Sequence, residues 1–489
     1  MRAPEIKKGR RAAPQTVSAR LSDRVTLEAR ANGQIVANFD GFSVELGAFS
    51  AGVVDRALEL RLGLPLASFA SGRRNSDKEI DQLVRRLARR GLLEFSFRGS
   101  RNNGDQVVVE PQVADYWPRM PRLDNADVLV LSRFAYMRRR GNEIVLESPR
   151  AGALFKICNP TIAATIAILS TPRQIRWLRR QDGFAGIELL ALLVDCQILF
   201  KIDADNDSGL RPAEGDDNLV LWDFHDLLFH ARSTEGRQAN PFGGVGLYAG
   251  VVPPLPAVRP RWPGKKINLH KFAAAHSEAV SPFAKLLHER HSIRQFDDHR
   301  PITLAELSQF LNNTARVLSR WESGVGLGGG PSVGYTVRPY PSAGASYELE
   351  LYLAVDKCEG LARGFYHYDA DGHALTPIGA RTHEIEALLT GAKFAMDTRS
   401  VPQVLITMAA RFGRVSWKYS SLAYALILKD VGVLTQTLYL MATDMGLGGC
   451  AIGNTNVDLF AKMTGIDFHV EGPVGQFALG RGSGSGTSD

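Results

Sequence analysis

The first 125 residues combine short alternating runs with one amphipathic stretch. The alternating runs, which have the two-residue period of β-strands, begin at Val25, Gln34 and Phe42. Ser76, followed three residues later by Glu79, has the capping-box pattern that opens a helix. Gly91 ends this helix, and the hydrophobic run from Leu92 to Phe97 predicts a strand. A helix, a glycine and a hydrophobic strand form the end of a winged helix-turn-helix unit, which we predict here.

The same order of elements returns in the next 80 or so residues. A helix with apolar positions from Ile187 to Val194 precedes a strand that begins at Ile198, and Gly141-Asn142 predicts a turn before an earlier strand. At an offset of 106 residues, four apolar positions coincide: Leu83, Leu87, Leu92 and Leu93 fall on Leu189, Leu193, Ile198 and Leu199. The match indicates a diverged internal duplication of two copies, which is too few for a solenoid.

Beyond residue 206 the pattern changes twice. A polar stretch and an aromatic helix from Leu221 to His230 lead to a proline-rich run, Val252 to Pro260, which favours an extended chain laid over a surface. From about residue 276 longer helices alternate with strands. Ser281-Pro282 predicts the start of one helix and Thr303 with Glu306 the N-terminus of the next. A long apolar helix is expected over residues 420–445. This is the pattern of an α+β domain.

Composition and charge narrow the function only partly. The chain has 489 residues, 45% hydrophobic and 22% charged, which predicts about three domains and excludes collagen-like, coiled-coil and mostly disordered chains. The sequence predicts no membrane span and no secretory signal, so we expect a cytoplasmic protein. Four widely spaced cysteines argue against disulfides and structural zinc, and no metal site is expected. The net charge of +7 suits a nucleic acid, a phosphate or an acidic peptide.

Three motifs in the C-terminal half offer ligand contacts. Arg290-His-Ser-Ile-Arg294 carries guanidinium and hydroxyl donors that suit phosphate, or a solvated helix end. Pro341-Ser-Ala-Gly-Ala345 has small residues that let backbone approach a flat ligand, or form a turn before a strand. The run Gly446 to Gly453 would free backbone donors in a loop. Its Cys450 is either a reactive thiol or a small packing residue.

A fourth motif is the pair Lys418-Tyr419, which we place at the start of the long apolar helix. The positive helix end and a dry surrounding would favour a neutral lysine. A neutral lysine acts as a general base near neutral pH. Taken alone, the pair also fits a surface lysine and its neighbour.

Together these motifs, with a late Ala478-Leu-Gly-Arg481, resemble the FMN-dependent nitroreductase fold. More narrowly, they resemble the SagB/McbC-type azoline dehydrogenases of thiazole/oxazole-modified peptide pathways. The aromatic helix around Trp222 and the Pro253-Pro-Leu-Pro run resemble the connector of that family. The doubled winged-helix region resembles the peptide-binding front end of its longer members, so the resemblance covers nearly the whole chain.

The resemblance implies a domain order and a set of site residues. The expected order is a disordered basic tail (1–20), winged-helix-like domains (21–125 and 126–205), a connector (206–275), a nitroreductase-like FMN domain (276–483) and a flexible tail (484–489). The implied catalytic pair is Lys418 and Tyr419. Residues implied to hold FMN are Arg290, His291, Ser292, Arg294, Pro341, Ser342, Ala343, Gly344, Gly448, Gly449, Cys450, Ala451 and Arg481. Departures from residues common in the family are Ser346, Glu348 and Thr437.

The implied activity is the oxidation of peptide thiazoline or oxazoline rings to thiazole or oxazole. Lys418 would take a proton while FMN accepts a hydride. The implied partners are an azoline-containing precursor peptide, a cyclodehydratase complex and a second copy of the chain, without nucleic acid or membrane. The alternatives are an NAD(P)H-dependent nitro or quinone reductase, a flavin-free leader-peptide scaffold for a cyclodehydratase, and a winged-helix transcription regulator.

One further string, Gly324-x-Gly-x-x-Gly329, matches the dinucleotide-binding fingerprint. We expect it to follow a helix and to form a mobile loop or a substrate-side lid, because no strand–turn–helix context supports nucleotide binding. DNA binding is also disfavoured, because the second predicted recognition helix, from Ile187 to Cys196, has no basic side chain.

Overall fold

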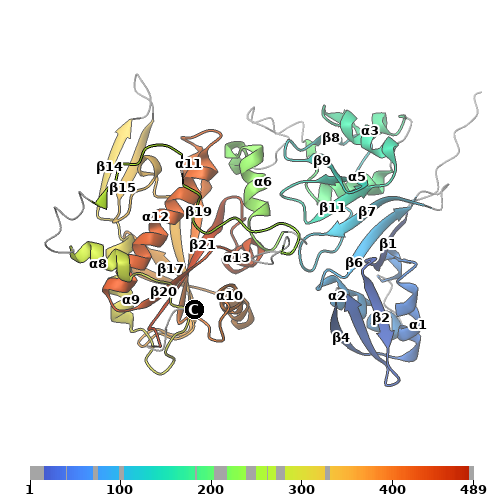
Figure 1. Ribbon diagram of the computed structural model, residues 1–489. Helices are drawn as coiled ribbons and strands as arrows, with labels where there is room; N and C mark the ends of the chain where they lie inside the picture. The colour runs from blue at the N-terminus through green and yellow to red at the C-terminus, as the bar shows by residue number, and fades with distance from the viewer. Residues whose placement is uncertain are drawn as a thin grey trace, which may run out of the picture. The chain divides into compact units, whose positions relative to one another are not determined.

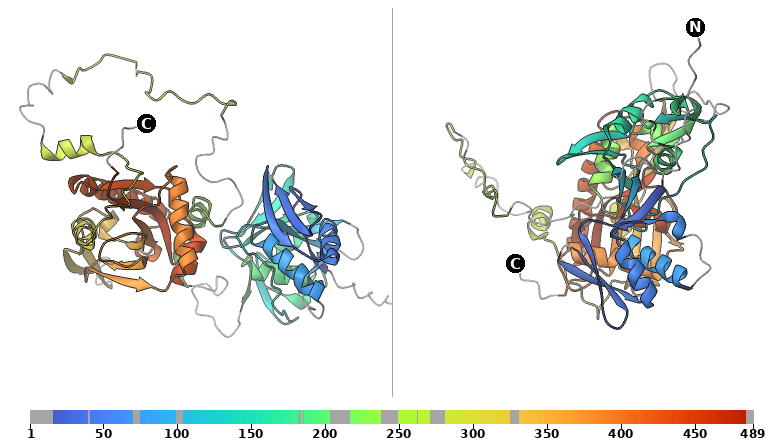
Figure 2. Two further views of the ribbon diagram at one scale, coloured as in Figure 1. Left: turned by 90° about the horizontal axis from the view of Figure 1, so that it is seen from below. Right: turned by 90° about the vertical axis from the view of Figure 1, so that its right-hand side faces the viewer.

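The structure is a computed structural model, shown in Figure 1 and Figure 2. It describes residues 16–39, 41–69, 75–98, 104–181, 184, 186–202, 217–237, 249–261, 263–270, 281–324 and 331–483. The chain divides into two compact units, Met1–Ala239 and Asn240–Asp489.

The first unit contains the same succession of elements twice. The first copy runs through β1 (Thr16–Leu21), β2 (Val25–Ala29), β3 (Gln34–Phe39), β4 (Phe42–Ala48), α1 (Ala51–Glu59), β5 (Leu64–Pro65), the 3₁₀ turn η1 (Leu66–Ser68), α2 (Asn75–Ala88) and β6 (Leu93–Arg98). The second runs through β8 (Val128–Leu131), β9 (Tyr136–Arg140), β10 (Glu143–Glu147), β11 (Ala153–Ile157), α3 (Pro160–Ile168), β12 (Arg173–Gln174), α4 (Ile175–Leu178), α5 (Ile187–Asp195) and β13 (Leu199–Ile202).

Strand pairing repeats as well. The order β5-β1-β6 in the first copy corresponds to β12-β8-β13 in the second, and β2-β3-β4 corresponds to β9-β10-β11. The eight apolar positions that coincide at the 106-residue offset are all buried in one core. Pairing and burial therefore both support the predicted duplication, while the winged-helix assignment stays a prediction.

One strand, β7 (Asp105–Pro111), has no counterpart after the second copy among the described residues. It pairs with β6 on one side and with β11 on the other, which joins the two copies in a seven-stranded sheet. The expected boundary at residue 125 therefore does not separate two sheets or two cores. The expected boundary of the tail at residue 20 is also wrong, because Thr16 to Leu21 form β1 and pair with β6; residues 1–15 lie outside the described residues.

The aromatic helix of the predicted connector belongs to the first unit. It forms α6 (Phe224–Arg232), preceded by the 3₁₀ turn η2 (Asp217–Leu221). The Arg232 guanidinium contacts the buried Glu147 carboxylate of β10, and Trp222 stacks on His230 with ring centroids 5.9 Å apart. The proline-rich segment 249–261 of the second unit has no helix or strand and its described residues are exposed, so the expected packing over a surface is not seen.

The second unit is built on an antiparallel sheet of order β18-β17-β16-β19-β21-β20. Its strands are β16 (Leu349–Val355), β17 (Gly364–Asp369), β18 (Ala374–Ile378), β19 (Val404–Arg411), β20 (Gly448–Ile452) and β21 (Glu471–Gly480). Its helices are α8 (Pro282–Glu289), α9 (Leu304–Ala315), α10 (Thr382–Ala395), α11 (Phe412–Ser416), α12 (Ala423–Asp444) and α13 (Val457–Thr464). A separate hairpin joins β14 (Ser319–Gly324) to β15 (Ser332–Val337).

Helices cover both faces of this sheet. One core cluster joins α10 and α13 to alternate sheet positions such as Leu405 and Ala409. The sheet positions between these face the opposite side of the sheet, which α12 covers. There, a Cβ on Gly475 would lie 2.9 Å from Val431 Cγ1 of α12. Figure 1 shows α12 running across the strands. By length and composition this helix is also apolar enough to cross a membrane, but a core helix passes the same test.

Two predicted details were confirmed and three were wrong. Ser281 and Thr303 are helix N-caps, and Thr303 forms the full capping box with Glu306. The segment Gly448–Ile452, expected as a loop, is the edge strand β20. Lys418-Tyr419 follow α11, and three residues separate them from α12. The run beginning at Gly324 starts at the last residue of strand β14 rather than after a helix, and residues 325–330 lie outside the described residues.

Candidate active site

The basic segment after α8 packs against β20 and α12. The Ile293 amide donates to the Gly449 carbonyl at 2.9 Å. The Ser292 hydroxyl shares a 2.8 Å hydrogen bond with the Tyr439 hydroxyl, which also accepts from the Ala451 amide. The Arg290 guanidinium lies 5.0 Å from the centroid of the Tyr439 ring. Tyr439 of α12 therefore holds Arg290, Ser292 and Ala451 in one place.

Two glycines of β20 allow this close packing. A Cβ on Gly448 would come within 2.7 Å of Ile293 Cγ2, and a Cβ on Gly449 within 2.3 Å of Phe477 Cζ. Both positions therefore require glycine because backbone and side chains approach so closely. The backbone donors expected in a loop instead belong to an edge strand, which pairs with β21 along one side.

Cys450 is a packing residue in this environment. Its side chain is buried, and burial raises the pKa of the Cys450 thiol, while the positive charge of Arg294 acts in the opposite direction. A thiol with a raised pKa is a weak nucleophile at neutral pH. Arg294 and His291 are exposed, and His291 Nδ1 lies 2.8 Å from the Glu289 carbonyl.

Arg481 reaches the same part of the unit from the end of β21. The Asp297 amide donates to the Arg481 carbonyl at 2.8 Å, and Phe296 forms a bridge with Gly482. The guanidinium itself makes two hydrogen bonds to the Glu306 carboxylate, at 2.7 and 2.8 Å. The backbone after Arg294 and the backbone at Arg481 therefore lie side by side. The Arg481 side chain, however, binds Glu306.

The turn after Pro341 has an unusual backbone. Gly344, Ala345 and Tyr347 all have positive φ angles, of 57°, 55° and 44°. Positive φ is costly for residues other than glycine, above all for a bulky side chain such as tyrosine. Strained residues of this kind persist where the surroundings hold them and concentrate at functional sites.

Two carboxyl groups, those of Asp430 and Glu348, lie beside Ser342 in this turn. Asp430 of α12 accepts from the Ser342 hydroxyl at 2.9 Å and from the Ala343 amide at 2.8 Å. The Ser342 hydroxyl in turn accepts from the Tyr347 amide at 2.9 Å. Glu348 is fully buried beside the same hydroxyl, and burial, with the neighbouring Asp430 charge, raises the pKa of Glu348 to about 7.

The predicted catalytic pair meets the turn at Gly344. The Lys418 ammonium donates to the Gly344 carbonyl at 3.4 Å. A Cβ on Gly344 would lie 2.3 Å from the Tyr419 hydroxyl and 2.7 Å from Lys418 Nζ, so only glycine fits between them. Lys418 is exposed and Tyr419 is half-buried. The dry surrounding expected for Lys418 is therefore not present in the isolated chain.

Helix α12 connects the two halves of the site. Asp430 supports the turn and Tyr439 supports the basic segment, nine residues further along, which is about 14 Å at the rise of an α-helix. Among the described residues, neither Arg290 nor Arg294 has a carboxylate within ion-pair distance. An anionic group at one end and a flat group over the turn at the other fit this arrangement, as FMN requires.

Sequence reasoning missed the supporting residues. Asp430 and Tyr439 stand inside an apolar helix, where a polar side chain at a buried position is the available signal. Tyr335 lies on the unpredicted hairpin, with its ring centroid 5.6 Å from Lys418 Nζ. Glu348 was noted only as a departure from the family pattern.

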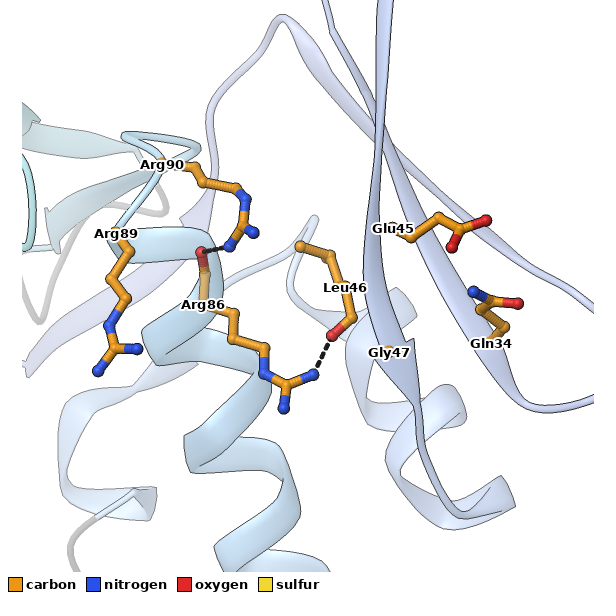
Figure 3. Close-up of a pocket in the computed structure, with 7 residues that line it drawn as sticks. All are labelled: Gln34, Glu45, Leu46, Gly47, Arg86, Arg89 and Arg90. Carbon is orange, nitrogen blue, oxygen red and sulfur yellow. Dashed lines mark hydrogen bonds between the residues drawn. The ribbon is translucent and has the colours of Figure 1, made fainter. Parts of the chain in front are cut away.

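A second candidate site lies in the first unit, between α2 and β4. Figure 3 shows this cavity, with a volume of about 680 Å³. Its basic wall is Arg86, Arg89 and Arg90, at the end of α2 and in the turn after it. The Arg86 guanidinium donates to the Leu46 carbonyl of β4. Among the described residues, β4 pairs with β3 alone, so its other edge carries no strand.

Comparisons with known proteins agree with this geometry. Residues 287–481 match the nitroreductase family, and residues 129–239 match the cyanobactin oxidase ThcOx. A protein named as a nitroreductase from Methanocaldococcus jannaschii is 29% identical over 168 residues, which are 34% of this chain and 76% of that protein. The microcin B17-processing protein McbC of Escherichia coli is 26% identical over 149 residues, 29% of this chain and 54% of McbC.

Solved structures were compared as well. A chain of the E. coli microcin synthetase McbBCD complex with truncated pro-MccB17 bound gives a TM-score of 0.39 at 19% identity, covering 56% of this chain and 97% of that one. A nitroreductase-like structure from Ralstonia eutropha gives 0.32 at 23% identity, covering 42% and 86%. The family matches and the McbC relative confirm the resemblance predicted from the motifs. Residues 287–481 of the chain therefore match the nitroreductase family, and the chain is similar to the microcin B17-processing protein McbC and, over residues 129–239, to the cyanobactin oxidase ThcOx.

Proposed function

We propose that this chain is an FMN-dependent dehydrogenase that oxidises thiazoline or oxazoline rings in a precursor peptide to thiazole or oxazole. The observation that carries the proposal is the packing of Lys418 Nζ and Tyr419 Oη against Gly344, in the turn of the family motif. The match to a cyanobactin oxidase and the similarity to a microcin-processing protein support a peptide substrate.

FMN would be held by both parts of the site. Arg290, Ser292 and Arg294 provide the donors for its phosphate and ribityl oxygens. Arg481 would join them after leaving Glu306, and the turn at Gly344 would face the ring system. When bound, FMN supplies a two-electron acceptor for hydride.

Lys418 would remove the proton from the azoline ring. Aromatisation removes two hydrogens, one as a proton and one as a hydride, so the ring needs a base on one side and the acceptor on the other. The Gly344 carbonyl, 3.4 Å from Lys418 Nζ, orients the amine toward the turn. Tyr419 Oη, beside the same glycine, would position the ring or relay the proton.

Peptide recruitment would use the cavity at β4. In the second copy, the strand equivalent to β4 is β11, and its outer edge is occupied by β7. By analogy with the second copy, the open β4 edge would accept an extended strand, as in β-strand addition. Three arginines along the cavity favour an acidic leader segment.

Substitution of Lys418 tests the catalytic assignment. Lys418→Ala should keep its flavin absorbance near ~450 nm, because the proposed phosphate and ribityl contacts at Arg290, Ser292 and Arg294 are elsewhere, and should lose azoline oxidation by at least about a hundredfold. The NAD(P)H-dependent reductase alternative predicts nicotinamide consumption without peptide, and the flavin-free scaffold predicts no such absorbance. A yellow Lys418→Ala protein that oxidises azoline peptide at the normal rate would show that another group is the base.

Substitution of Arg90 tests recruitment separately. Arg90→Glu should weaken binding of an acidic leader peptide, measured by fluorescence anisotropy, while oxidation of a short leaderless azoline substrate stays unchanged. Arg61→Glu, an exposed position that does not line the cavity, is the matched control. Equal leader affinity in the Arg90 and Arg61 variants would place the leader elsewhere.

A further inference from the structure

The hairpin β14–β15 stands beside the proposed catalytic pair and is firmly anchored. A two-stranded hairpin is marginally stable alone, so its contacts with the rest of the unit matter. The Arg414 guanidinium of α11 donates to the Gly334 carbonyl of β15 at 3.1 Å and to the Ser346 carbonyl at 3.2 Å. On the other strand, Arg320 pairs with Asp371, Nε to Oδ1 at 2.9 Å. The hairpin is therefore tied to the strained turn on one side and to the β17–β18 connection on the other.

Two aromatic rings face each other across the hairpin. Trp321 and Tyr335 are register partners, and their rings stack with centroids 4.4 Å apart and planes 16° apart. Tyr335 is 8% exposed, whereas Trp321 is 46% exposed. Tyr335 is also the ring 5.6 Å from Lys418 Nζ. Tyr335 therefore contacts both Lys418, the proposed base, and the exposed indole of Trp321.

The two rings line a cavity of about 570 Å³ in the second unit. This size suits a small ligand or one to two residues of a peptide. Its wall also has cationic and anionic groups: Arg320, Arg338, Arg411, Glu322, Glu350, Asp369 and Asp371.

We infer that this cavity is a substrate subsite for the residue beside the reacting ring, and that Trp321 binds a planar aromatic ring there by stacking. The inference rests on the proposed function, because it takes Lys418 as the position of the reacting azoline. Flat rings gain from offset stacking on aromatic side chains beyond their area burial. The substrate class is thus narrowed to peptides in which a planar ring, such as an azole already formed, lies next to the azoline.

The kinetic test compares two azoline peptides that differ only in the neighbouring residue, a thiazole in one and glycine in the other. For the thiazole peptide, Trp321→Ala should raise KM by roughly five- to tenfold and leave kcat nearly unchanged. Trp321→Phe should restore most of the loss. For the glycine peptide, both variants should match the unsubstituted chain. An equal change on both peptides, or no change on either, overturns the inference.

A binding measurement distinguishes a failure of the proposed subsite from a failure of the proposed dehydrogenase function. Titration with a non-reacting bis-thiazole peptide should quench the fluorescence of Trp321, and the quench should disappear in Trp321→Phe. The control is Trp177→Phe, which removes an exposed indole from the first unit and should leave the quench intact. This readout needs no turnover, so it tests the subsite even if the chain oxidises no azoline. A quench that persists in Trp321→Phe overturns the subsite.

Discussion

Gly344 is constrained by both its backbone and its neighbours. Its φ of 57° is unfavourable for other residues, and the Lys418 and Tyr419 side chains fill the space where a Cβ would stand. The backbone alone costs an L-residue about 1–2 kcal/mol in this region. The lysine amine is the flexible end of a long side chain, so it would move before the backbone does.

Gly344→Ala should therefore lower the free energy of unfolding by about 1–2 kcal/mol and reduce azoline oxidation more than flavin content. Urea unfolding and the flavin-to-protein absorbance ratio measure the two effects. Gly453→Ala is the matched control, because nothing lies within 4 Å of a Cβ there. A Gly344→Ala protein with unchanged activity would mean that the Lys418 position does not matter.

Glu348 makes stability depend on pH in a defined direction. Its pKa is about 7 in the folded chain, against an ordinary value of 4.5. Between these values the folded chain holds a proton that the unfolded chain has lost, so the free energy of unfolding falls as pH rises from about 4.5 to 7.

Glu348→Gln, which resembles the neutral acid, should remove this decline. At pH 8 the variant should be more stable by up to about 3 kcal/mol, and the two proteins should agree at pH 4.5. Urea unfolding across this range, with Glu386→Gln as an exposed control, measures the difference. Parallel curves for the Glu348 variant and the unsubstituted chain would show that Glu348 is ionised in the folded protein.

At the scale of elements, one residue of helix α9, Glu306, both caps the helix and binds Arg481, which is proposed to contact the FMN phosphate. Glu306 closes the capping box with Thr303 and also binds Arg481 through both carboxylate oxygens. A capping box accepts glutamine at this position, so Glu306→Gln separates the two roles. The cap should survive while the charge pair with Arg481 is lost.

Glu306→Gln should therefore bind FMN about two- to fivefold more tightly, since a half-exposed ion pair of this kind is worth up to about 1 kcal/mol. Its melting temperature should change little. Arg481→Gln should weaken FMN binding, and fluorescence titration with FMN measures both variants. Unchanged affinity in both variants would remove Arg481 from the FMN site.

Short-range sequence patterns predicted most individual helices and strands correctly, but not which strands pair with one another. The caps at Ser281 and Thr303, the strands β2, β3, β4 and β6 of the first copy and the duplication follow from short-range periodicity, whereas β1 and β5 were not predicted. Strand pairing over long separations does not, and so β7 joining the two copies was missed. The two basic motifs were expected together, but the Glu306 contact of Arg481 depends on side-chain geometry that periodicity does not encode.

At the scale of the whole molecule, the described residues of the segment 249–270 are exposed and present apolar side chains. Its exposed apolar side chains include Val251, Leu255, Val258, Ile267 and Leu269. Exposed apolar surface of this extent marks an interaction site. A second copy of the chain, as the family resemblance implies, would cover it.

Light scattering should therefore give a mass of twice 53.5 kDa at micromolar concentration. A variant with both Leu255→Asp and Val258→Asp should shift toward the monomer. The double variant should keep its far-UV circular dichroism, because neither side chain is packed in the single chain. A monomer before substitution, or a dimer that the double variant leaves intact, would contradict this assignment.

The most direct test of the central claim is mass spectrometry of an azoline-containing peptide after incubation with the purified chain, FMN and oxygen. The account predicts the loss of two hydrogens for each ring oxidised, with no nicotinamide cofactor required. It also predicts that this loss disappears with Lys418→Ala. An unchanged peptide mass in the presence of FMN-loaded protein, together with rapid NAD(P)H consumption in the absence of peptide, would contradict it.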